Sequence, residues 1–169
     1  MIYERHTDAV FRYLSRRVGA GAAEDLLGDV FAAAVHARLR ARPHSSGSAL
    51  PWLYGIAKNV LRAHLRQSGA PSSSSAEYAM DWDAIDARVD AAGQREGLRT
   101  ALNALTSAER EVLLLVAWEH LTVSEAAEAL DITAVAARSR LHRARARAGS
   151  ALLAIPTSTG RQEPDYETR

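Results

Sequence analysis

Two short motifs near the C-terminal end constrain the fold of this chain most, because each fixes the residue at which a helix begins. Both match the capping box, in which a threonine hydroxyl accepts a hydrogen bond from the amide three residues later and a glutamate there reaches back to the threonine amide. They occur at residues 106–109 (TSAE) and 122–125 (TVSE). The first predicts a helix that extends to about Glu119, and the second predicts a short helix from Val123 to Leu130.

A third helix start follows closely and completes a helix-turn-helix arrangement. The chain must turn at Asp131-Ile132, and Thr133 is placed to cap the helix that follows. In that last helix, small and apolar residues repeat at spacings of four and three, which predicts a buried seam. The predicted seam consists of Ala137, Leu141, Ala144, Ala148 and Leu152.

The other side of this last helix is predicted to contact DNA. Arginine side chains bind phosphates and the edges of guanines in the major groove. The candidate contact residues are Arg138, Ser139, Arg140, His142 and Arg143, with Arg147 on the same side. The alternative is an arginine-rich surface helix, but such faces usually carry interspersed glutamates, which this helix lacks.

The chain as a whole is predicted to be all-α, since strand signals are nearly absent and alanine, the best helix former, is abundant. Residues 67–75 (QSGAPSSSS) have the composition of a flexible linker. The predicted division is an N-terminal unit (1–66), a Ser-rich acidic linker (67–90), a C-terminal unit (91–153) and a polar tail without fixed structure (154–169).

Composition excludes several classes of function. The chain has no cysteine, which excludes disulfides, thiol catalysis and cysteine-based zinc sites. Its six histidines lack the spacing of a helical zinc site, so no metal and no other cofactor is expected. No segment approaches the ~20 apolar residues of a membrane span, and no signal-peptide pattern is present, so a cytoplasmic location is predicted.

Charge is segregated along the sequence although the net charge is only +1. Residues 30–76 and 132–150 contain no acidic side chain, and both stretches are rich in arginine. Two basic blocks separated by an acidic middle suggest two contacts with a polyanion. Solvated helix faces explain the composition equally well.

Three helices are predicted in the N-terminal unit. The first covers about residues 2–18 and ends at Gly19-Ala20-Gly21, and the second begins near Ala22. The second helix has an apolar side and an opposite side with Asp25 and Asp29. Because two carboxylates four residues apart repel slightly, a partner protein is one explanation for this acidic side and plain solvation is the other.

The third helix begins at Leu50-Pro51, where proline at the first turn costs little. At about 100° per residue, Gly55 and the polar residues Lys58, Asn59, Arg62 and Arg66 share one stripe, with Trp52 at its edge. Such a stripe fits phosphates and an unstacked base. The opposite side, predicted to face a core, consists of Leu53, Ile56, Ala57, Val60 and Leu61. The alternative is that Trp52 and Tyr54 are core residues at the helix boundary, and Tyr54 is interpreted in this way.

Together these features resemble bacterial RNA polymerase sigma factors of the extracytoplasmic-function (ECF) subfamily, over about residues 2–153 and in the family's order. Residues 3–14 resemble the start of region two, and residues 24–31 (EDLLGDVF) its segment that binds the β′ clamp helices of the polymerase. Residues 50–59 (LPWLYGIAKN) are similar to the segment that melts the promoter and reads the −10 element. Residues 124–130 (SEAAEAL) and 138–145 (RSRLHRAR) resemble region four, which reads the −35 element.

The resemblance implies two small helical domains joined by a flexible linker: a three-helix region-two unit and a helix-turn-helix region-four unit, without enzymatic activity. It implies core-polymerase contacts at Asp25, Leu26, Asp29, Val30 and Phe31, −10 contacts at Trp52, Lys58, Asn59, Arg62 and Arg66, and −35 contacts at Arg138, Ser139, Arg140, His142 and Arg143. The implied partners are core RNA polymerase (β′ clamp helices and β flap), promoter DNA and an anti-sigma factor, with no small-molecule substrate.

The sequence departs from the family's pattern at a few positions. Residues 42–47 (RPHSSG) lack the aromatic with which some members capture a flipped base of the −10 element. Residues 135–137 (VAA) stand where the family usually has Gly-Thr-Val, and Asp131 replaces the turn glycine. Aspartate adopts the left-handed conformation at modest cost, so the fold is expected to survive, whereas the missing threonine hydroxyl is expected to weaken a phosphate contact or alter −35 preference.

Two other functions compete with this interpretation. A stand-alone helix-turn-helix regulator, whose N-terminal helices dimerise or sense a ligand, predicts tight operator binding without polymerase. The order of motifs in residues 22–66 argues against it. A helical hydrolase that uses Glu4, His6 and Asp8 is disfavoured because no nucleophile or pocket is implied.

Overall fold

The computed structural model describes residues 2–38, 47–67 and 92–154. Within these ranges the chain forms helices and no strand, which confirms the predicted all-α class. The helices are α1 (Ile2–Ala37), α2 (Leu50–Gln67), α4 (Ala92–Asn103), α5 (Ser107–Ala117), α6 (Val123–Leu130) and α7 (Ala134–Leu153). None of these helices has the length and apolar content needed to cross a membrane. Apart from Gln67 and Ala154, the predicted linker and tail lie outside the described ranges.

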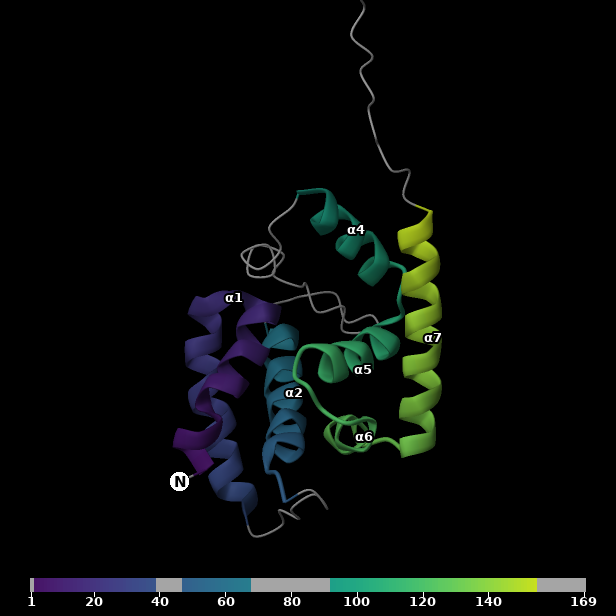
Figure 1. Ribbon diagram of the computed structural model, residues 1–169. Coiled ribbons are helices and arrows are strands. Elements are labelled where there is room, and N and C mark those ends of the chain that lie inside the picture. The colour runs from purple at the N-terminus through teal and green to yellow at the C-terminus, as the bar shows by residue number, and fades with distance from the viewer. Residues whose placement is uncertain (1, 39–46, 68–91, 155–169) are drawn as a thin grey trace, which may run out of the picture.

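Helix α1 contains a break at the predicted helix stop. Gly19 has φ 78° and ψ 164°, a conformation that glycine adopts far more easily than other residues. The chain reverses there, and the two halves of α1 lie side by side (Figure 1). Their apolar sides form one core that includes Val10 and Leu14 from the first half and Leu26 and Val30 from the second.

Helix α2 completes the N-terminal unit and begins where the sequence predicted. The Leu50 amide donates to Ser48 Oγ at 3.2 Å, and Pro51 lies in the first turn. Leu53, Ala57 and Leu61 are fully buried, which confirms the predicted core side of this helix.

Both predicted capping boxes are present in the C-terminal unit. Glu109 N donates to Thr106 Oγ1 at 3.3 Å and Thr106 N donates to Glu109 Oε2 at 3.1 Å. The corresponding distances for the pair Thr122 and Glu125 are 3.2 Å and 2.9 Å. The starts of α5 and α6 therefore follow from local sequence alone.

The turn between α6 and α7 also has its predicted geometry. Asp131 adopts the left-handed conformation, with φ 55° and ψ 50°, and Thr133 caps α7 by accepting from the Ala136 amide at 3.1 Å. Ala137, Leu141 and Ala144 are buried as predicted. The prediction was wrong for Leu152, which is 49% exposed.

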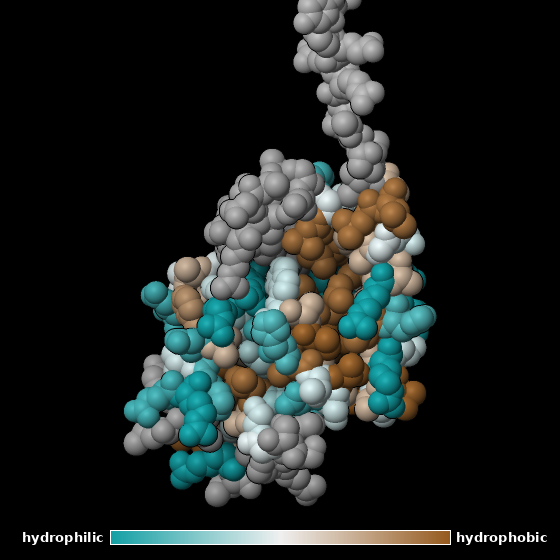
Figure 2. Space-filling view, in the orientation of Figure 1, coloured by the Kyte–Doolittle hydropathy of each residue, from teal (hydrophilic) through white to brown (hydrophobic). Residues whose placement is uncertain are grey.

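The two units pack directly against each other, an arrangement that the sequence did not predict. In Figure 1, α5 and α6 lie between α2 on one side and α7 on the other. One hydrophobic core joins α1 and α2 to the C-terminal residues Leu115, Leu121, Ala126 and Ala129. A second, smaller cluster lies between α4, α5 and α7 and includes Leu102, Leu105, Leu114 and Ala144. Figure 2 shows apolar side chains over this second cluster.

We expect the backbone at Asp131 to determine how substitutions there affect stability. Asp131→Gly should raise the free energy of unfolding, whereas Asp131→Ala should lower it, with the two variants about 1–2 kcal/mol apart, because a left-handed residue with a Cβ is strained. Urea denaturation measures both values. Asp131→Asn is the control, since it removes the charge but keeps a residue that tolerates this conformation. Equal stability of the Gly and Ala variants would contradict the prediction.

Candidate nucleic-acid interface

Helix α7 presents the predicted DNA-contact residues on its outer side. Arg138, Ser139, His142 and Arg143 are exposed, and Arg140 is half-buried. They lie opposite the buried alanines and Leu141 that fix α7 on α5 and α6. The helix-turn-helix therefore leaves the basic side of its last helix open to a partner, as a recognition helix requires.

A buried carboxylate orients part of this basic side. Glu109 is 3% exposed and accepts from Arg143 Nε at 3.3 Å and from Arg147 Nη1 at 2.9 Å. Arg143 also donates to Ser139 Oγ at 2.6 Å. Glu109 thus caps α5 and holds two arginines of α7 at the same time. The sequence revealed the capping role through the TSAE motif but not the contact with α7, which depends on how the two helices cross.

The pKa of Glu109 lies below its ordinary value. Burial alone would raise this pKa, but the hydrogen bonds from Thr106 and the charges of Arg147 and Arg143 outweigh burial and favour the ionised form. The carboxylate is therefore charged over the whole neutral range and counts as part of the electrostatic surface of α7.

The predicted stripe on α2 is divided between exposed and buried residues. Asn59, Arg62 and Arg66 are exposed, and Trp52 is partly buried against the core. Lys58 is only 6% exposed. Burial and the nearby Arg62 charge lower the pKa of Lys58.

The residues predicted to bind polymerase have two different roles in the fold. Asp25 and Asp29 are exposed on the outer side of α1, and their acidic surface is available to a partner. Leu26, Val30 and Phe31 are buried in the core that α1 forms with α2. They hold the acidic residues in place, and direct contact of these three with a partner stays a prediction.

A polar cluster between the two units was not predicted. It consists of Tyr13, Arg16 and Arg17 from α1, Tyr54 from α2, Glu111 from α5 and Glu119 just beyond α5. Tyr54 was interpreted as a core residue, and its ring is indeed buried 5.0 Å from the ring of Tyr13, centre to centre. Burial and the adjacent Glu119 carboxylate raise the pKa of Tyr54, so its hydroxyl remains a donor. No sequence signal marks these six residues as neighbours.

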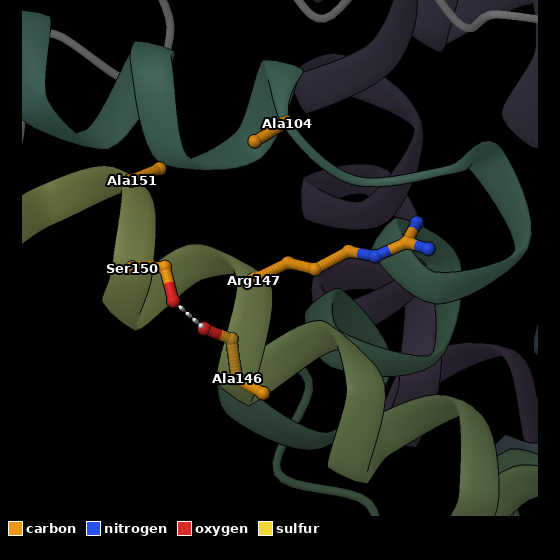
Figure 3. Close-up of a pocket in the computed structure, with 5 residues that line it drawn as sticks. All are labelled: Ala104, Ala146, Arg147, Ser150 and Ala151. Atoms are coloured by element: carbon orange, nitrogen blue, oxygen red, sulfur yellow. Dashed lines mark hydrogen bonds between the residues drawn. The ribbon is translucent and has the colours of Figure 1, made fainter. Parts of the chain in front are cut away.

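A shallow hollow of about 450 Å³ between α4 and α7 does not have the features of a catalytic site. It is lined by Ala104, Ala146, Ser150 and Ala151, and by the stem of Arg147, whose guanidinium points away towards α5 (Figure 3). The Ser150 hydroxyl donates to the carbonyl of Ala146 at 3.0 Å, so no general base holds it. The ranges 2–38, 47–67 and 92–154 also contain no group of acidic or histidine side chains placed to hold a metal ion.

Comparison with known protein families yields two matches. The family model for sigma-70 region 2 matches residues 2–70, and the model for sigma-70 region 4 matches residues 95–147.

Two curated proteins are similar in sequence. The RNA polymerase sigma factor NccH of Alcaligenes xylosoxydans xylosoxydans is 33% identical over 131 residues, which covers 73% of this chain and 69% of NccH. The probable RNA polymerase sigma factor RfaY of Xanthomonas campestris pv. campestris is 34% identical over 139 residues. That match covers 78% of this chain but only 34% of RfaY, so the chain spans about a third of that relative's length.

Two solved structures have a similar fold. CnrH, in complex with the cytosolic domain of CnrY, superposes with a TM-score of 0.60 at 25% identity and covers 90% of this chain and 86% of CnrH. The sigma factor RpoE of Bartonella quintana, in complex with the anti-sigma factor NepR, superposes with a TM-score of 0.55 at 21% identity. The match covers 92% of this chain and 93% of RpoE.

The contacts of Glu109 predict a pH-dependent contribution to stability. Glu109→Ala should lower the free energy of unfolding by about 1–2 kcal/mol at neutral pH, because the cap and both arginine contacts are lost. Glu109→Gln should cost less, since glutamine can still reach back to the cap. The folded-state pKa of Glu109 is lowered, so its charge stabilises the folded protein. The wild type should therefore have a higher free energy of unfolding than Glu109→Gln above the ordinary pKa of 4.5, and this difference should disappear as the pH falls through the folded-state pKa.

Urea denaturation of the wild type and of Glu109→Gln, over a series of pH values from neutral downwards, measures this difference directly. A difference that stays constant over the series would show that the charge of Glu109 does not stabilise the fold.

Proposed function

Because this chain belongs to the family of RNA polymerase sigma factors, in its two-region ECF form, we propose that it binds core RNA polymerase and directs transcription from promoters with particular −10 and −35 elements. It acts as a non-enzymatic subunit in the cytoplasm, where the polymerase works. The exposed basic side of α7, placed by a complete helix-turn-helix, is the observation that carries the proposal.

In this proposal the −35 element is read by α7. Arg138 and His142 are exposed near the start of the helix, the part of a recognition helix that reaches base edges. Arg143 is oriented by Glu109 and Ser139, which lowers the entropy that the side chain loses on binding. Ala136, at the position of the family's threonine, is half-buried beside Val135, which is 68% exposed, so the missing hydroxyl changes the edge of the surface assigned to DNA.

The −10 element is assigned to α2. Asn59, Arg62 and Arg66 form an exposed polar stripe, and Trp52 lies at its edge, partly buried. Arginines and an amide suit phosphates and base edges, and an aromatic suits a base that leaves the stack. The loop that precedes α2 in the family's scheme, residues 42–47, lies outside the described residues except for Gly47.

Core polymerase is assigned to the acidic side of α1. Asp25 and Asp29 are exposed and carry a charge that basic residues of a partner can pair with. The proposal includes the β′ clamp helices as that partner, and a contact of region four with the β flap. Control by an anti-sigma factor is part of it as well, since CnrH, which has a similar fold, is known in complex with the cytosolic domain of CnrY.

Reversal of the charge at Asp29 should weaken the binding of core RNA polymerase by about tenfold or more, because an attractive contact becomes repulsive. The binding affinity of purified core polymerase for Asp29→Arg measures this effect. Asp8→Arg is a matched control, since Asp8 is an exposed aspartate in the other half of α1. Equal affinity of the two variants would refute the assignment of the acidic side.

Arg138→Ala should cost about 1–3 kcal/mol of promoter binding by the holoenzyme and should relax the preference for one −35 base pair. Arg145→Ala is the control, because Arg145 is exposed two turns further along α7 and lies outside the assigned contacts. The control should reduce the salt dependence without changing base preference. Transcription from promoters with each −35 position randomised distinguishes the two. An unchanged preference in Arg138→Ala would remove that residue from the reading surface.

A further inference from the structure

The arginines on the outer side of α7 are held in different ways. The Arg143 side chain is 51% exposed and that of Arg147 is 49% exposed, yet both guanidiniums donate to the buried carboxylate of Glu109. This carboxylate belongs to the first turn of α5, not to α7. Among the described residues, Arg138 and Arg145 of the same helix have no hydrogen bond or ion pair. Arg143 and Arg147 are therefore oriented by the fold, whereas Arg138 and Arg145 are not.

The guanidinium of Arg143 is held at two of its nitrogens. Nε donates to Glu109 Oε1 at 3.3 Å, and Nη1 donates to Ser139 Oγ at 2.6 Å. Ser139 lies one turn earlier on α7, so the side chain is tied to its own helix and to α5 at once. A planar guanidinium that is held at two points has one preferred orientation.

This orientation restricts how Arg143 can bind a base. An arginine reads guanine by donating to O6 and N7 through two of its nitrogens. Because Nε is engaged by Glu109, the nitrogens left for guanine are Nη1 and Nη2 at the end of the side chain. Nη1 carries two hydrogens, so its bond to Ser139 leaves one for a base. The geometry therefore favours an end-on approach of Arg143 to a guanine.

The carboxylate that holds Arg143 is itself fixed through its other oxygen. Glu109 Oε2 accepts from the Thr106 amide at 3.1 Å and from Arg147 Nη1 at 2.9 Å. Figure 3 shows the guanidinium of Arg147 directed towards α5. Two bonds on Oε2 set the direction of Oε1, so the capping box of α5 determines where Arg143 is held.

We propose that Glu109 is a positioning residue for −35 recognition, which holds Arg143 end-on to a guanine of that element and keeps Arg147 away from the DNA phosphates. The proposal rests on the function proposed above. Arginines that are released from a carboxylate are drawn to the phosphates, which bind them without regard to sequence. Glu109 thus raises the specificity of α7 and lowers its non-specific affinity, although it does not itself contact DNA.

Glu109→Gln in the full chain, assembled with core RNA polymerase, tests the proposal. Glutamine has one acceptor oxygen in place of two, so it cannot bind the Thr106 amide, Arg143 and Arg147 together. On promoters with each −35 position randomised, the preference for guanine at one position should fall about fivefold.

The same variant should bind DNA without a −35 element more tightly than the wild type. One negative charge is lost and an arginine is freed, so the slope of log affinity against log salt concentration should become steeper by about one. A purely structural role for Glu109 predicts the opposite, since a damaged helix-turn-helix would weaken both kinds of binding. Circular dichroism checks that the variant is folded.

Glu125→Gln is the matched control. Glu125 is a buried glutamate in the same capping-box position of α6, where it accepts from the Thr122 amide. Its replacement removes one charge and weakens one cap, but it leaves the contacts of Arg143 in place, so the guanine preference should not change. Arg143→Ala should abolish that preference, and Glu109→Gln added to Arg143→Ala should have no further effect on it.

An unchanged guanine preference in folded Glu109→Gln would overturn the proposal, and so would an equal loss in Glu125→Gln. A further loss when Glu109→Gln is combined with Arg143→Ala would overturn it too, because Glu109 would then act through another residue. If the wild-type holoenzyme shows no −35 preference at all, the proposed function fails together with this inference. If the wild type shows a preference that Glu109→Gln retains, the inference alone fails.

Discussion

Two glutamates buried between the N-terminal and C-terminal units orient these two units relative to each other. A carboxylate taken out of water must be paired and hydrogen-bonded. Glu111 is bound by Tyr13 and Arg17, and Glu119 is bound by Arg16 and Tyr54. Apolar burial brings the units together, but these ion pairs select one orientation. The position of α6 over α2, and the burial of Lys58, follow from that orientation.

Helix α5 links this arrangement to the helix-turn-helix. Its first turn carries Glu109, which caps the helix and holds Arg143 and Arg147 of α7, and its next turn carries Glu111, which faces α1. Helix α5 therefore contacts both α7 and the N-terminal unit.

Features that depend on a few neighbouring residues could be predicted from the sequence. The capping boxes at Thr106 and Thr122, the break at Gly19 and the left-handed Asp131 are local, because hydrogen bonds and backbone conformation within four residues decide them. Helical periodicity likewise located Leu53, Leu61 and Leu141 in cores. The contact between units could not be predicted in this way, since periodicity distinguishes an apolar side from a polar one but not which distant helix covers it. Lys58 was placed on an open surface for that reason, and Leu152 was placed in a seam that ends before it.

The functional account combines two surfaces assigned to DNA, an acidic surface assigned to the polymerase, and a contact between the units that buries Lys58. Transcription in vitro from a genomic library by core RNA polymerase, with and without this protein, tests the central claim most directly. The account predicts that the protein binds the core enzyme and produces new, discrete start sites that share −35 and −10 elements. Sequence-specific DNA binding without any association with the core enzyme, and without new start sites, would contradict it and would indicate a stand-alone helix-turn-helix regulator.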